Sequence, residues 1–138
     1  FEAYMSAPTN THWSRENRTV GLRVPASSAE ARRVENRIPG ADINPYLGVA
    51  ASLVCGYLGM LEKIEPREEY LGEGYLDRER PLPKSLMDSV DNFTRSKGLR
   101  DALGDSFVDT FAAIKRAEYE HRSSVLSPWD VRFLMTNV

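Results

Sequence analysis

The feature that most constrains the fold is an uncharged stretch of 19 residues, 43–61. It opens with Asn44 and Pro45, a typical helix start in which asparagine caps the first turn and proline takes the first helical position. The residues that follow are apolar on nearly every side, so the sequence predicts a buried helix over residues 44–62. Its continuous apolar part, residues 46–61, is shorter than the roughly 20 residues of a membrane span, and no membrane insertion is expected.

Residue types within and around this helix limit the possible sites. The single cysteine, Cys55, is expected in the core; it excludes an internal disulfide, offers no zinc cluster and indicates a reducing compartment, the cytoplasm. Gly48, Ser52 and Gly56 form a stripe of small side chains that another backbone can approach. The formal net charge of -2 differs from the positive charge that binds nucleic acid or an anionic membrane surface, so neither partner is expected. His12 lacks a partner at a ligand spacing and is interpreted as a loop residue.

Residues 1–40 have the pattern of strands and turns. Apolar side chains alternate with polar ones over residues 19–25 and again over 31–39, and each run ends at a proline. A short connection joins the two runs, so we expect an antiparallel pair that carries arginines on one face.

A loop is expected over residues 65–84, because this stretch is rich in charge, glycine and proline and has no sustained period. Its length suggests a functional flap or an oligomer contact. Residues 85–138 are predicted to be helical, with caps at Ser85, Asp105 and Ser127. The first of these helices is expected to end at Gly98, and the second to place Phe107, Phe111 and Ile114 on one face. Strands followed by helices give an α+β fold class.

The charged run of the second strand permits two interpretations. Arg33, Glu35 and Arg37 would form a row on one strand face, with neighbours about 6.6 Å apart. Such a row can be a surface ion-pair ladder that adds little stability. It can also be a site for an anion and a metal, because arginines bind phosphate or carboxylate and a glutamate can hold Mg²⁺ or Mn²⁺. Arg18 and Arg23 enlarge the positive cluster.

Three segments carry a resemblance to a known family. They are WSRENRTVGLRVP, ARRVENRIPGADINPYL and AASLVCGYLGM, in that order. The chain resembles the C-terminal part of the catalytic domain of the glutamine synthetase family over nearly all of residues 1–138. The resemblance implies the creatine kinase-like catalytic fold and, for residues 1–40, one wall of the active site. It also implies self-association, because the family forms stacked hexameric rings.

The resemblance further implies the site and its chemistry. The family makes γ-glutamyl phosphate from glutamate and ATP on divalent metals, Mg²⁺ or Mn²⁺, and lets ammonia or an amine displace the phosphate. By this likeness Glu35 is a metal ligand, Arg37 holds the glutamate carboxylate, and Arg23 and Arg33 contact the nucleotide. Arg18 contacts both the glutamate and the γ-phosphate, and Glu2 matches the glutamate of a flap near the amine site.

Differences from the sequence that is common in the family bear on whether ammonia or an amine is the acceptor. Glu30 stands where many ammonia-using members have a lysine, and the C-terminal sequence is more similar to the γ-glutamyl-polyamine and amine ligase branch. The expected function is therefore a fragment of an ATP-dependent carbon–nitrogen ligase that condenses glutamate with an amine. The isolated piece is expected to be inactive, because it has only one of the family's metal carboxylates. An ammonia-using glutamine synthetase and a non-catalytic assembly or regulatory module are the alternatives.

Overall fold

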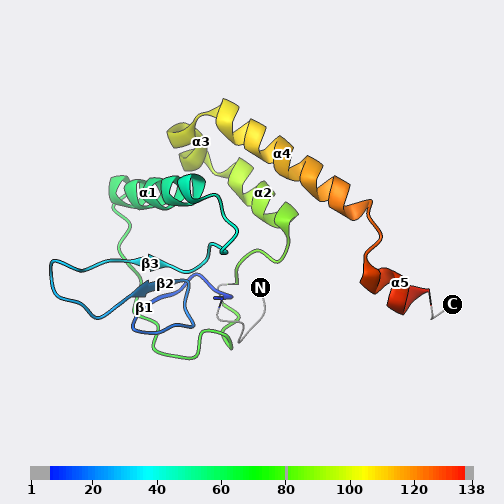
Figure 1. Ribbon diagram of the computed structural model, residues 1–138. Coiled ribbons are helices and arrows are strands. Elements are labelled where there is room, and N and C mark those ends of the chain that lie inside the picture. Colours follow the sequence, from blue (N-terminus) through cyan, green and yellow to red (C-terminus); the bar gives the residue numbers. More distant parts are fainter. Residues whose placement is uncertain (1–6, 80, 136–138) are drawn as a thin grey trace. The chain divides into compact units, whose positions relative to one another are not determined.

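The computed structural model describes residues 7–79 and 81–135, and the chain divides after Lys84 into two compact units. The first unit holds a three-stranded sheet and one long helix, and the second is helical (Figure 1). The strands are β1 (Trp13–Arg15), β2 (Leu22–Val24) and β3 (Glu35–Asn36), and the helices are α1 (Pro45–Leu61), α2 (Leu86–Arg95), α3 (Lys97–Leu103), α4 (Asp105–Ser123) and α5 (Pro128–Leu134). The predicted α+β class is confirmed.

The sheet has the order β1-β2-β3. β2 and β3 are antiparallel, with Leu22 opposite Asn36 and Arg23 opposite Glu35, so the predicted antiparallel pair is confirmed. The pairing is shorter than the alternating patterns. One cause is Pro25, which has no N–H to continue the ladder after β2.

β1 is parallel to β2, although only six residues separate the two strands. Parallel neighbours usually need a connection of a dozen residues or more. Here Glu16 reverses the chain in a left-handed conformation, with φ of 57°. Asn17 continues the turn, because its side-chain oxygen accepts from the Thr19 N–H at 2.9 Å. The three residues of β1 are too few for an alternating pattern to reveal.

The buried side chain of Asn10 joins three segments of the first unit. Its amide nitrogen donates to the carbonyls of Thr19 at 2.9 Å and of Gly74 at 3.0 Å. Its oxygen accepts from the N–H groups of His12 at 3.1 Å and of Gly21 at 3.3 Å. A side chain that is 0% exposed thus satisfies four backbone groups, of which those of Gly21 and Gly74 are buried.

The loop over residues 65–84 contains no helix or strand in its described part, as expected, yet it is firmly attached to β1. The Tyr70 N–H donates to the Trp13 carbonyl at 3.0 Å, and the Trp13 indole donates to the Arg67 carbonyl at 2.7 Å. At Gly74 the loop comes so close that a β-carbon would lie 2.4 Å from the Thr19 carbonyl oxygen, so only glycine fits.

His12 has a defined role that its spacing in the sequence does not reveal. Its Nε2 lies 2.6 Å from an oxygen of Asp77, and its ring stacks on Tyr70 with 4.2 Å between the ring centroids. The backbone N–H of Glu79 first, and then the His12 ring, hold the pKa of Asp77 below its usual value. His12 thereby attaches the N-terminal segment to the loop.

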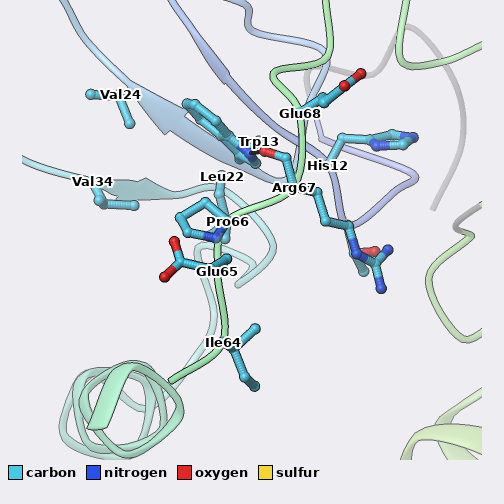
Figure 2. A pocket seen from close by; sticks show the side chains of 11 residues that line it. His12, Trp13, Leu22, Val24, Val34, Ile64, Glu65, Pro66, Arg67 and Glu68 are labelled. Atoms are coloured by element: carbon cyan, nitrogen blue, oxygen red, sulfur yellow. Dashed lines mark hydrogen bonds between the residues drawn. The ribbon is translucent and has the colours of Figure 1, made fainter. Parts of the chain in front are cut away.

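The apolar face of the sheet borders an open cavity of about 580 Å³. Figure 2 shows the chain over Ile64–Glu68, whose Pro66 lines the cavity together with Leu22 and Trp13. Val24 and Val34 line the same cavity. Leu22 and Val24 therefore face the cavity, while Arg23 between them faces the other way, as period-2 alternation requires.

α1 starts and ends close to the predicted residues. The Asn44 side chain caps it by accepting from Tyr46 N–H at 3.0 Å and Leu47 N–H at 3.3 Å. The prediction that the helix over residues 44–62 is buried is wrong for this structure, since α1 has no buried residue and Cys55 is exposed. A helix that is apolar on every side is buried only when neighbours surround it.

Of the small-residue stripe of α1, Ser52 lies against β3, where its hydroxyl accepts from the Asn36 amide at 3.1 Å. The space around Gly56 is open, since a β-carbon added there would meet no described atom within 4 Å.

In the second unit α2 packs against α4. Val90, Val108 and Ala112 are buried between them, and Phe93 meets Phe111 edge to face at 5.6 Å. The predicted cap at Ser85 is confirmed. The cap at Ser127 is confirmed as a full capping box with Asp130.

Two expectations for these helices are wrong. Gly98 lies inside α3, because the chain breaks two residues earlier, at Ser96, whose side chain caps α3. Gly104 rather than Asp105 precedes α4, and Asp105 instead pairs with Arg100 at 2.9 Å. Phe107, Phe111 and Ile114 lie within α4 and therefore share one face, as predicted. The buried residues of α4, Val108 and Ala112, each come one position after one of the two phenylalanines.

Within residues 7–79 and 81–135, no helix is both long enough and apolar enough to cross a bilayer.

Replacing Asn10 tests whether its side chain holds the three segments of the first unit together. Asn10→Ala leaves four backbone groups without partners, so we expect the free energy of unfolding to fall by about 3 kcal/mol. The measurement is urea denaturation followed by circular dichroism. Asn92→Ala, at an exposed position of α2, is the control and should change stability by at most about 0.5 kcal/mol. Equal stability of the two variants would contradict the role.

Acid should weaken the attachment of the loop. Because the folded pKa of Asp77 is lowered, its carboxylate stabilises the fold above its unfolded pKa of about 3.9, and this contribution is lost as the pH falls through the folded value. The urea midpoint of the unchanged chain should exceed that of Asp77→Asn at about pH 6, and the gap should narrow toward about pH 3. A gap that stays constant over this range would disprove the assignment.

Candidate functional site

The charged face of the sheet carries a cluster of ion pairs. Arg23 lies opposite Glu35 in the register of β2 and β3, and its Nη1 donates to Glu35 Oε2 at 2.7 Å. Arg37 donates from Nη1 to the other oxygen, Oε1, at 2.9 Å. Glu35 therefore joins two guanidiniums, one from its own segment and one from the neighbouring strand.

The burial of this cluster bears on the two interpretations of the charged row. The side chains of Arg23 and Arg37 are 13% and 15% exposed, and that of Glu35 is 37% exposed. Arginines of a surface ladder keep their guanidiniums in water, whereas these are largely withdrawn from it. Hydrogen bonds from Arg23 first, and then from Arg37, hold the pKa of Glu35 below its usual value despite the opposing effect of burial.

The carboxylate of Glu16 is a second partner of the Arg23 guanidinium. Its Oε2 lies 3.3 Å from Arg23 Nη2, and its Oε1 accepts from the backbone N–H of Ala26. The Ala26 N–H is the largest cause that lowers the pKa of Glu16, and the charge of Arg23 lowers it further. Hydrogen bonds to Glu35 and Glu16 raise the pKa of Arg23, which stays a cation.

The structure does not bring Arg33 into this cluster. β3 begins only at Glu35, so the strand spacing does not extend back to Arg33, whose guanidinium is 3.4 Å from a nearby backbone carbonyl, Ala31 O. The predicted row is therefore right for Glu35 and Arg37 and wrong for Arg33. Arg18 lies exposed in the turn between β1 and β2. Glu2 lies outside the described residues.

The described residues do not make up a metal site. They contain no group of three or more histidine, cysteine or acidic side chains that could hold an ion. Both oxygens of Glu35 contact guanidiniums, and one carboxylate beside two cations is a poor ligand set for Mg²⁺. Glu35 as a metal ligand stays a prediction that requires further carboxylates from elsewhere.

The arginines fit an anionic ligand better. Arg18 and Arg33 are exposed and form no salt bridge with another described residue, so their guanidiniums are available to phosphate or carboxylate oxygens. Arg23 has a buried Nε without a hydrogen-bond partner within residues 7–79 and 81–135, an unused donor beside its two carboxylates.

Glu16 is the member of the site that sequence reasoning missed. It lies outside the alternating runs, and a carboxylate within WSRENR looks like a partner of its sequence neighbours. The sequence does contain a signal for Glu16. Glu16 and Glu35 are carboxylates within a segment rich in arginine, and buried arginines need negative partners.

Comparisons with known proteins identify the family. A sequence model of the catalytic domain of glutamine synthetase matches residues 1–134. A glutamate–isopropylamine ligase of Pseudomonas sp is 39% identical over 125 residues, which are 88% of the chain and 27% of that relative. The γ-glutamylputrescine synthetase PuuA of Escherichia coli is 33% identical over 138 residues, 99% of the chain and 29% of that relative. The chain thus spans less than a third of these relatives.

A solved structure has the same fold. The chain superimposes on a complex of GmaS with ADP with a TM-score of 0.79 and 30% identity, covering 94% of this chain and 30% of that one. These matches lead to one conclusion. The chain belongs to the glutamine synthetase family and corresponds to part of that family's catalytic domain.

Proposed function

We propose that the full-length protein is a cytoplasmic ATP-dependent carbon–nitrogen ligase that activates glutamate as γ-glutamyl phosphate and condenses it with an amine. The observation that carries this proposal is the half-buried cluster of Arg23, Glu35 and Arg37 within a family whose relatives include amine ligases. The chain would supply one wall of the active site.

The chemistry follows from where the positive charges lie. Phosphoryl transfer needs cations around the moving group, because negative charge spreads over its oxygens in the transition state. We propose that Arg23 and Arg33 contact the phosphates of ATP, that Arg37 binds the carboxylate of glutamate, and that Arg18 contacts both substrates. Glu2 is proposed to lie near the amine.

An amine is the preferred acceptor. The relatives compared above are named for isopropylamine and putrescine, and Glu30 stands where the family resemblance places a lysine in many ammonia-using members. Ammonia is the second candidate, since the family also contains glutamine synthetases proper.

A substitution at Glu35 tests the site. In the full-length protein Glu35→Gln keeps the shape but loses the charge between Arg23 and Arg37, so we expect kcat to fall by about 10²-fold or more. The measurement is phosphate release with ATP, glutamate and, in turn, isopropylamine, putrescine and ammonia. Glu68→Gln, exposed in the loop, is the control and should retain activity. Unchanged turnover of Glu35→Gln would refute the proposed site, and ammonia as the best acceptor would refute the amine preference.

The 138-residue chain by itself should be inactive and should self-associate. It offers at most one metal carboxylate among its described residues, and α1 exposes large apolar side chains, including Leu53 and Met60, which favour association in water. Light scattering should give a mass above the 15.6 kDa of one chain. A monomeric chain would contradict the expected self-association. A chain that transfers glutamate with ATP would contradict the expected inactivity.

A further inference from the structure

We infer that Glu16 is a positioning residue, which holds the Arg23 guanidinium in the orientation in which Arg23 contacts the nucleotide phosphates. The inference rests on the proposed function and adds to it a residue that the proposed substrate contacts do not include. It starts from the contacts of Glu16 with β2 and with the segment that follows β2.

Three contacts fix Glu16. Its backbone N–H donates to the Val24 carbonyl at 3.3 Å, one carboxylate oxygen accepts from the Ala26 N–H, and the other contacts Arg23 Nη2 at 3.3 Å. The side chain remains 55% exposed, yet both oxygens have defined partners. A glutamate that only faced solvent would need none of these contacts.

The backbone conformation of Glu16 also supports a positioning role. With φ of 57° the residue is in the left-handed region, which glycine and asparagine adopt far more readily than glutamate. A glutamate here carries a conformational cost that glycine would avoid. The contact of its carboxylate with Arg23 is a reason for a long acidic side chain at this position.

The two carboxylates on Arg23 have different surroundings. Glu35 Oε2 contacts Nη1, while Glu35 Oε1 accepts from Arg37; Glu16 contacts the separate Nη2. An incoming anion can therefore compete with Glu35 for Nη1 while Nη2 stays attached to Glu16. Glu16 keeps the guanidinium plane fixed during that exchange, so less rotamer freedom is lost when the phosphate binds.

The test measures ADP binding to the full-length protein by calorimetry. Glu16→Gln can still accept from the Ala26 N–H but carries no charge toward Arg23. Glu16→Gly adopts the left-handed backbone without strain and has no side chain to hold Arg23. We expect both variants to bind ADP about tenfold more weakly, as for loss of one charge-assisted hydrogen bond. Glu62→Gln, an exposed change after α1, is the control and should bind ADP like the unchanged protein.

Thermal unfolding separates positioning from a purely structural role. Glu16→Gly loses the two carboxylate contacts but is relieved of the backbone cost, so its melting temperature should change little while ADP binds more weakly, a combination that a purely structural role does not produce. ADP affinity equal to that of the unchanged protein in both variants would overturn the inference and leave the proposed function standing. If the unchanged protein neither binds ADP nor transfers glutamate, the proposed function fails, and this inference fails with it.

Discussion

Four backbone groups of the first unit share one buried side-chain amide, that of Asn10. Through it the N-terminal segment, the turn before β2 and the loop at Gly74 hold fixed positions relative to one another. β1 and β2 together contribute only six residues, so regular strand hydrogen bonds alone could not fix this arrangement. The charged face depends on it in turn, because Arg23 and Glu16 lie on the two sides of the turn that Asn10 closes.

Charge balance explains how the arginines can be withdrawn from water. Arg23 and Arg37 face Glu35 and Glu16, so the cluster of four contains two charges of each sign. Burial of an unpaired guanidinium would cost several kcal/mol, and pairing with hydrogen bonds offsets that cost. The surplus positive charge lies outside the cluster, on the exposed Arg18 and Arg33, where an anionic ligand can reach it without displacing a carboxylate.

The sequence predicted those parts of the structure that local chemistry determines. Asn44 followed by Pro45 located the start of α1, Ser127 with Asp130 located that of α5, and alternation paired β2 with β3. The burial of α1 could not be predicted from its apolar character, because burial depends on what surrounds a helix.

What was missed depends on contacts that residue spacing does not reveal. The pairing of Glu35 with Arg37 followed from strand spacing, but the partnership of His12 with Asp77 joins residues 65 positions apart. Glu16 was missed for a different reason. Its contact with Arg23 depends on a left-handed turn, and no residue pattern in WSRENR indicates such a turn at a glutamate.

The short link between β1 and β2 has a consequence for the order of folding. Asn10 reaches Thr19 and Gly21 across 9 and 11 residues, whereas its contact with Gly74 spans 64. Closing a short segment costs less chain entropy than closing a long one, so residues 10–24 can form their turn before the loop arrives. By this argument the loop attaches after that turn has formed, and a transient opening of the loop would leave Arg23 and Glu16 together.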